Sequence, residues 1–550
     1  MTIRKGCCPT TGGSGPSGPD RFAPLVIVGN TLEGDPAVAY TTDEFHYVPD
    51  TGNGAGIATA MTLVPASGGR VYIKRGTYTF SNAGGPTGPI AVPTNTTVQG
   101  EGRNATVILG RATGDQGVFT TGLFCAVVDM AVGVAAADPA GVTSAAIITS
   151  TGRLHMQNVN VSVVASATGT LRYGIRHTGA FTLSLHDVAF IATASHLGAA
   201  TPTCAIRISG GATLQAQGIS AQGFDIGLNT DRSFNYITGF VCTDFHVSGL
   251  RQTNSTGGAS GGQVLLNNFR FVSDSNAIAV PLDLQWFTNE IANGFISAPN
   301  AAFGVRYYRA GSTLGGSSFT NLYVSGPAVG IQVRSANYVG ITSPTMFVTL
   351  ANGTGIQFLD SSYGSVSQPR IECAVAGATL VDISGTGGGI TITSPQFQIA
   401  DGNVGTTRAV RMRSTGCQVQ GGFIQVTSGG TVISIEATTN CDVNGVEIFA
   451  ADAPALPLVN VDGSPGCTVN GNRLIASSRN HPKIEIVNAT ASSVINSNRV
   501  QSANGQIGIR FAAGTANNNC VGNFCQGSTF GGGLAVTDLG TNNVAQNYGS

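Results

Sequence analysis

The sequence repeats one phrase at an interval of about 25 residues, and this period restricts the fold more than any other feature. The phrase joins an apolar start, an Asn and an apolar finish, as in CTVNGNRL (Cys467–Leu474) and SVINSNRV (Ser493–Val500). The apolar residues that end successive phrases are Phe245, Phe269, Phe295, Leu322, Phe347, Ile371, Phe397, Phe423, Ile448, Leu474, Val500 and Cys525. Their separations are 24, 26, 27, 25, 24, 26, 26, 25, 26, 26 and 25 residues. Such a constant interval indicates a solenoid in which each repeat forms one coil.

Within each phrase apolar and polar residues alternate, which is the pattern of a strand with one buried face. The repeat lacks the leucine frame of a leucine-rich repeat and is shorter than a propeller blade. It therefore predicts a parallel β-helix with roughly three short strands per coil. Roughly 18 coils from residue 90 onward, about 4.8 Å apart, predict a rod on the order of 85 Å long. Wider spacing at Val159, Val188 and Ile219 predicts longer loops in the earlier coils.

Composition agrees with a β-protein and argues against several functions. Of 550 residues only 10% are charged, 42% are hydrophobic and 77 are glycine. A net charge of −1 and the lack of a basic run argue against nucleic acid as a partner. No run of 18 apolar residues occurs, so membrane insertion is not expected. The eleven cysteines lack paired CxxC spacing, so we expect reduced thiols and neither a metal nor a cofactor.

Two neighbouring segments resemble a known family. Gly56–Ser81 has the pattern of a short amphipathic helix, a Gly-Gly pair and a strand, and IAVPTNTTVQGEGRNATVI follows at Ile90–Ile108. This series resembles the opening of pectate-lyase-like right-handed parallel β-helix proteins, among which bacteriophage tailspikes commonly start this way. The resemblance implies an all-β, right-handed solenoid with a short N-terminal helix that caps the first coil. Family members often have an Asp-rich stretch before the helix, where this chain has YVPDTGNGAG (Tyr47–Gly56).

The resemblance also implies an organisation and a function. We expect an N-terminal arm for virion attachment at residues 1–45, the capping helix and first coils at 46–110, and the β-helix at 111–550. The chain is expected to form a homotrimeric spike on the virion surface that binds host cell-surface polysaccharide. Its arm is expected to contact a baseplate, tail or capsid protein. The start at Met1 lacks an apolar signal region, which predicts assembly in the host cytoplasm.

Three functional alternatives remain at this point. The spike cleaves the polysaccharide as a hydrolase or lyase, or it is a non-enzymatic adhesin or structural protein of the virion. A cellular polysaccharide-degrading enzyme is the third alternative, and the lack of a signal peptide argues against it.

Cysteine and asparagine recur at fixed places in the repeat. One column holds Cys417, Cys441, Cys467, Val494, Cys520 and Val544. Because Cys and Val interchange there, we predict a buried stack of small apolar side chains and not a redox or metal ladder. The asparagines two residues before a phrase end include Asn267, Asn293, Asn472, Asn498 and Asn523. Asparagine at a corner tolerates left-handed backbone, so these side chains are predicted to hydrogen-bond along their own stacks.

Candidate site residues come from the outward face. If Phe245 points inward, its neighbours Asp244 and His246 point outward, and Asn268 and Arg270 take the same columns on the next coil. Glycan hydrolysis generally needs two carboxylates, whereas a lyase needs a base and a group that neutralises the acid of the substrate. Nearby carboxylates and aromatic residues that stack on sugar rings complete the set. The candidate catalytic residues are Asp244, His246, Asp283 and Glu290, and the candidate substrate-binding residues are Arg270, Asn268, Trp286, Tyr307 and Tyr323.

The alternative interpretation is that these residues are solvated turn charges and aromatic residues at a subunit interface. Asp244 has no evident carboxylate partner in its column. The isolated His155, His177 and His186 are expected to be structural. We expect function where longer turns interrupt the repeat.

Overall fold

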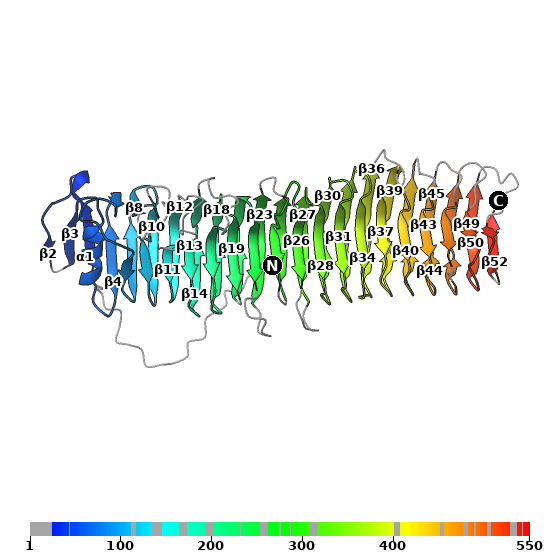
Figure 1. Cartoon of the computed structure of the whole chain (residues 1–550), viewed down its shortest axis with the longest axis horizontal. Coiled ribbons are helices and arrows are strands. Elements are labelled where there is room, and N and C mark those ends of the chain that lie inside the picture. Colours follow the sequence, from blue (N-terminus) through cyan, green and yellow to red (C-terminus); the bar gives the residue numbers. More distant parts are fainter. Residues whose placement is uncertain are drawn as a thin grey trace, which may run out of the picture.

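The computed structural model shows a rod of stacked parallel strands, with the N-terminal helix near one end and the last strands at the other (Figure 1). The predicted right-handed parallel β-helix is therefore confirmed. The structure describes residues 25–42, 44–111, 117–134, 146–163, 173–192, 202–231, 233–253, 262–273, 277–285, 288–308, 316–400, 407–428, 430–451, 456–476, 482–488, 491–502, 508–527, 536–541 and 543–549. In this part of the chain no helix is long and apolar enough to cross a membrane.

The N-terminal part of the described chain is continuous with the sheet. Strand β1 (Leu25–Asn30) pairs in parallel with β3 (Phe45–Asp50) and with β4 (Gly69–Ile73), while β2 (Tyr40–Thr41) pairs antiparallel to β3. Residues from 25 onward thus belong to the first rungs of the rod. The rest of the expected arm, residues 1–24, lies outside the described residues.

The predicted helix is α1 (Ala55–Leu63), which packs against β1, β3 and β6 (Ile90–Val92). Its buried residues include Ile57, Ala60 and Met61. The side chain of Asp50 supplies the N-terminal cap: Oδ2 accepts from the backbone N–H of Gly56 at 2.8 Å, and Oδ1 accepts from that of Asn53 at 2.9 Å. Asp50 thus satisfies the N–H groups of Gly56 and Ile57, and Asn53 Oδ1 accepts from that of Ala55 at 3.0 Å.

A regular coil contains three strands, as the repeat predicts. One example consists of β43 (Val459–Asp462), β44 (Thr468–Asn470) and β45 (Arg473–Ala476). The first strand belongs to a ladder that runs from β6 to β51 (Val536–Asp538), and the other two belong to a large sheet. Each strand pairs in parallel with its equivalent in the next coil, so side chains at equivalent positions form columns along the rod.

One column marks the bend between the two strands of the large sheet, and every residue in it has left-handed backbone. We call it the corner column. Its members are Asp129, Asn158, Asp187, Gly218, Gly239, Asn268, Asn293, Asn321, Ser343, Gln368, Ser394, Gly421, Gly445, Gly471, Ser497 and Gly522, with φ between 49 and 72°. Gly, Asn and Asp dominate the column because they tolerate this conformation best.

The strand pairings also define an inward column that runs through the core. It contains Ile108, Val132, Val161, Phe190, Ala221, Cys242, Phe271, Ile296, Val324, Met346, Ile371, Phe397, Ile424, Ile448, Leu474, Val500 and Cys525, all buried. Six of the predicted phrase-ending residues lie in this column, from Ile371 to Cys525. Phe295, Phe347 and Phe423 are each one residue away and point outward, because apolar residues occur on both faces there. Phe245 is three residues away.

The cysteine column is partly as predicted. Cys417, Cys441 and Cys467 lie in consecutive rungs and are buried. Placing Cys520 in the same column was wrong, because the next rung is Ser493 and Cys520 lies beside Ile495. The nine cysteines within the described ranges are buried and form no disulfide. Burial raises the pKa of Cys525 to about 12, as it does for Cys204, so the thiols of these two residues stay protonated and pack as small apolar groups.

The asparagines bond along their stacks as predicted. Asn472 Nδ2 donates to Asn498 Oδ1 at 2.9 Å, and Asn498 Nδ2 donates to Asn523 Oδ1 at 2.9 Å, within the buried interior. On the exposed surface, Asn293 Nδ2 donates to Asn267 Oδ1 at 2.9 Å. Both sets of hydrogen bonds tie neighbouring coils together, although Asn267 is the register partner of Ala292 and not of Asn293.

Candidate functional site

A polar cleft of about 520 Å³ lies on the outer surface at the corner column of the earlier coils. We call it the aspartate cleft, and its lining residues are Arg103, Asp129, Gln157, Asn158, Asp187, Val188, Ala189, Gly218 and Ser220. Most of these come from β10 (Cys125–Val134), β12 (Leu154–Val163), β15 (Ala189–Ala192) and β18 (Ser220–Gln222), and from the bends before β15 and β18. Arg103 lies on the turn between β7 (Thr96–Gly100) and β8 (Thr106–Gly110).

Strand register brings the polar residues of this cleft together. The pairing of β10 with β12 puts Asp129 beside Asn158, and the next pairing puts Asn158 beside Asp187. The two carboxylates are thus two rungs apart, about 9–10 Å between Cα atoms at 4.8 Å per rung. All three residues have left-handed backbone, which Asp and Asn adopt more readily than other side chains.

The carboxylate of Asp129 is held in place by two amides. Asn158 Nδ2 donates to Oδ1 at 2.8 Å, and Gln99 Nε2 donates to Oδ2 at 3.1 Å. The carboxylate of Asp187 lies over Gly218, where a Cβ would come within 2.6 Å of Oδ1. The cleft therefore combines fixed acceptors, amide donors and one guanidinium, which together suit a ligand with many hydroxyl groups.

Two histidines lie on the strands that lead into this bend. The rings of His155 and His186 are 5.5 Å apart between centroids, and His186 lies beside Gln157 of the cleft. His177 differs, because it is fully buried and its Nε2 lies 2.9 Å from the carbonyl oxygen of Phe181. Burial lowers the pKa of His177.

A second cleft of about 390 Å³ lies further along the corner column. We call it the Glu290 cleft, and its lining residues are Tyr236, Ile237, Thr238, Leu265, Leu266, Asn267, Glu290, Ala292 and Asn293. They lie on β20 (Phe234–Thr238), β23 (Gln263–Ser273) and β25 (Glu290–Ser297). Tyr236, Leu265 and Glu290 are register partners in successive rungs, and Tyr236 is 46% exposed. Among the predicted site residues that the structure describes, Glu290 is the one that lines either cleft.

The predicted patch around Asp244 does not form in the expected register. Strand β21 (Val241–Phe245) pairs with β23 so that Val241 lies beside Arg270 and Thr243 beside Val272. The shift arises because this coil has 29 residues where the repeat predicted 24. Asn268 instead lies beside Gly239. Asp244 accepts from Gln222 Nε2 at 2.9 Å, and His246 is half-buried.

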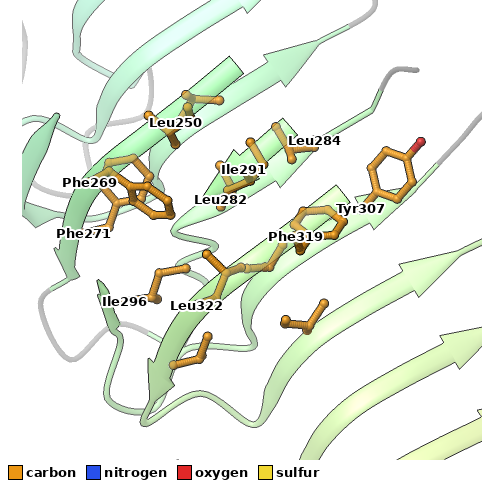
Figure 2. Packing of buried hydrophobic residues seen from close by; sticks show 14 of the residues in the cluster. Leu250, Phe269, Phe271, Leu282, Leu284, Ile291, Ile296, Tyr307, Phe319 and Leu322 are labelled. Atoms are coloured by element: carbon orange, nitrogen blue, oxygen red, sulfur yellow. The ribbon is translucent and has the colours of Figure 1, made fainter. Parts of the chain in front are cut away.

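Asp283 and Tyr307 are engaged inside the structure. On β24 (Leu282–Leu284), the buried Asp283 accepts from Arg306 Nε at 3.0 Å and from Nη2 at 2.8 Å. Hydrogen bonding to Asp283 raises the pKa of Arg306. Tyr307 is fully buried next to Phe319, as Figure 2 shows, so the expectation that it is available to a substrate on the surface is wrong. Trp286 lies outside the described residues.

Tyr323 belongs to an aromatic ladder on the outer surface. Its ring stacks on Phe295 with centroids 4.9 Å apart and planes 10° apart, and it contacts Phe347 at 5.4 Å. The guanidinium of Arg270 lies 5.5 Å from the centroid of Phe295. These contacts cover ring faces that a sugar would otherwise use, so the ladder chiefly ties neighbouring coils together.

The aspartate cleft was missed because the repeat was traced through apolar residues. A signal was present: Asp129, Asn158 and Asp187 follow one another at intervals of 29 residues, and an apolar residue comes directly after each. That interval is longer than in the later coils, as expected for a site where the repeat loosens.

No family model matches the chain, and no curated protein does either. The N-terminal fragment of gene product 12 of bacteriophage Phi29 is 12% identical with a TM-score of 0.32, over 90% of this chain and 91% of that one. DFA-IIIase from Arthrobacter chlorophenolicus is 11% identical with a TM-score of 0.29, over 73% and 84%. The A-module of a mannuronan C-5 epimerase from Azotobacter vinelandii is 12% identical with a TM-score of 0.18, over 91% and 95%.

At these identities and TM-scores the likeness carries no functional argument. The strand pairings alone place the chain among parallel β-helix proteins. Within the described residues, no group of three or more His, Cys, Asp or Glu side chains is arranged to hold a metal ion.

Proposed function

We propose that the chain is a virion-surface spike of the bacteriophage tailspike type that binds host cell-surface polysaccharide in the aspartate cleft. The observation that supports binding is the convergence of Asp129, Asn158, Asp187 and Arg103 on one outward cleft. Sugar hydroxyls donate to carboxylates and accept from guanidinium and amide groups. The virion assignment rests on the sequence resemblance over residues 56–108.

The position of the aspartate cleft on paired strands favours polysaccharide binding. Its polar groups are attached to paired strands and fixed by hydrogen bonds, so a ligand meets a preorganised surface and little ordering free energy is lost. The proposal includes a homotrimer, with residues 1–45 joined to a tail, baseplate or capsid protein. Light scattering of the purified chain tests the trimer, which predicts three times the mass of one chain.

Binding is tested with the purified chain on an array of bacterial capsular and O-antigen polysaccharides. We expect binding to at least one polysaccharide, and a loss of at least tenfold in affinity for Asp187→Asn. Asp462→Asn is the control, because it makes the same change at an aspartate that lies far along the rod and accepts from Asn488 Nδ2 at 2.6 Å. Absence of binding across the array, or equal losses in the two variants, would contradict the proposal.

Cleavage of the polysaccharide is a second candidate function, favoured by the separation of the two carboxylates. Inverting glycosidases hold their carboxyl groups about 6.5–9.5 Å apart, and two rungs of a β-helix separate the Cα atoms of Asp129 and Asp187 by about 9–10 Å, near the upper end of that range. Asp129 already accepts two amide N–H groups and suits the base, which leaves Asp187 as the acid.

Product sizing by chromatography tests cleavage on the polysaccharide that binds. We expect shorter products whose anomeric configuration is inverted, and no products from Asp129→Asn or Asp187→Asn. A wild-type chain that binds without shortening the polysaccharide is instead a non-enzymatic adhesin.

A further inference from the structure

The aspartate cleft and the Glu290 cleft lie on the same corner column, on the outside of the rod. The aspartate cleft occupies the rungs of Asp129, Asn158 and Asp187, and the Glu290 cleft reaches the rung of Asn293. Register pairs the intervening members one with the next, so the column continues without a break from one cleft to the other.

The column loses its side chains where the two clefts adjoin. Gly218 lines the aspartate cleft, and Gly239 follows Thr238, which lines the Glu290 cleft; their φ angles are 63° and 72°. Asparagine and aspartate are equally compatible with this backbone, as Asp187 and Asn268 on either side demonstrate. Backbone conformation therefore does not require glycine at Gly239, where an added Cβ would meet only ordinary contacts, and neither glycine places a side chain on the column where the clefts adjoin.

The two clefts differ in chemistry in a way that suits successive parts of one chain of sugars. The aspartate cleft offers mostly polar groups, which match hydroxyls. In the Glu290 cleft, the side chain of Leu265 lies one rung from Glu290, and the exposed ring of Tyr236 lies two rungs from it. Apolar surface beside hydrogen-bonding groups matches a sugar ring, which has apolar faces and a polar edge.

We propose that the two clefts form one binding surface for a linear polysaccharide that lies along the rod axis and crosses Gly218 and Gly239. This inference rests on the proposed function and names the substrate class: an extended polymer, bound over several linked sugars. From Asp129 to Asn293 the column advances six rungs, about 29 Å at 4.8 Å per rung. Short fragments fill one cleft, and only longer ones reach both.

Gly239 is the position at which the path can be obstructed with the least change to the fold. A Cβ there would lie 3.4 Å from the backbone nitrogen of Gly218, which is ordinary contact, and asparagine adopts this backbone elsewhere in the column. Gly218 is unsuitable, because a Cβ there would displace the carboxylate of Asp187. Gly471→Asn is the matched control: it has the same backbone state, no atom within 4 Å of the added Cβ, and a distant place on the rod.

The experiment uses fragments of the capsular or O-antigen polysaccharide that binds on the array, separated by length into about two to three sugars and about eight or more. Calorimetry is expected to show at least tenfold tighter binding of long fragments by the wild-type chain. Gly239→Asn should remove that advantage and leave affinity for short fragments within about twofold, while Gly471→Asn should match the wild type. Equal affinity for both lengths, or an equal loss for both lengths in Gly239→Asn, would overturn the inference and leave the proposed function standing. Failure of the wild type to bind any polysaccharide would overturn both.

Discussion

Replacing Asn498 by alanine removes the centre of the buried asparagine stack. Its Oδ1 accepts from the backbone N–H of Asn472 at 3.0 Å and from Asn472 Nδ2 at 2.9 Å. Its Nδ2 donates to the carbonyl of Val469 at 2.8 Å and to Asn523 Oδ1 at 2.9 Å. All three asparagines are at most 1% exposed, so water cannot replace these partners without opening the coil.

The expected loss of stability in Asn498→Ala depends on which hydrogen-bonding groups are left without a partner. Asn472 Nδ2 keeps the carbonyl of Val443, and Asn523 Oδ1 keeps the backbone N–H of Asn498. The backbone N–H of Asn472 loses its acceptor, and an unsatisfied buried group costs about 1–3 kcal/mol. With the other lost bonds, we expect Asn498→Ala to lower the local opening free energy by about 2–4 kcal/mol.

Native-state hydrogen exchange measured by mass spectrometry checks this, because coils of a solenoid open locally and one global free energy does not describe them. Peptides that contain Asn472 should exchange faster in the variant by the factor that corresponds to this loss. Asn267→Ala is the control: it removes one bond on the exposed surface, and we expect a change within about 0.5 kcal/mol. A loss below about 1 kcal/mol for Asn498→Ala, or equal losses in both variants, would refute the reasoning.

Three further predictions concern other buried groups. Asp50→Ala should lower the protection of α1 against hydrogen exchange by about 2 kcal/mol, because backbone N–H groups at the helix start lose their acceptor. An unchanged exchange rate in Ala55–Leu63 would contradict the role of Asp50 as the cap. Arg306→Met should lower the opening free energy of its coil by about 1–3 kcal/mol in hydrogen exchange, because the buried Asp283 loses two charge-assisted hydrogen bonds and keeps Arg251 at 3.9 Å; adding Asp283→Leu should recover most of the loss. Burial lowers the pKa of His177, so the unfolded chain binds the proton more readily and stability should fall as pH drops through about 6.5. The urea midpoint should therefore fall less steeply with acid in His177→Gln than in the wild type, and equal slopes would argue against this contribution.

The sequence predicted the register best where coil length is constant. Coils from Ile448 to Cys525 contain 25 or 26 residues, and there the apolar residue found by counting is the residue in the core. The coil from Ala221 to Cys242 contains 21 residues and the coil from Cys242 to Phe271 contains 29. Their average length is 25 residues, so a count based on the average repeat misses both the short coil and the long one. Counting from Phe269 therefore placed Phe245 in a column to which it does not belong.

The candidate site was harder to predict because sequence neighbours turn to different faces of a coil. Asp283 and Glu290 are seven residues apart, yet one lies in the ladder that contains β24 and the other in the large sheet. Within one strand, alternation separates Arg306, which faces outward to pair with Asp283, from Tyr307, which enters the core. The sequence indicates residue types that can bind sugars, but only strand pairing shows which of them share a surface.

The corner column explains how a binding surface can arise without a change in fold. Left-handed backbone restricts each member mainly to Gly, Asn, Asp and a few other polar residues, and these types differ little in their fit to the bend but greatly in chemistry. Replacing Asp187 by Asn should therefore cost the coil little stability, because Asn158 occupies the same position one rung away. The same exchange removes a carboxylate from the cleft. Under the proposed function, regular repetition and binding coincide at this bend: the fold fixes where the side chain points, and the choice among a few tolerated residues determines what it binds.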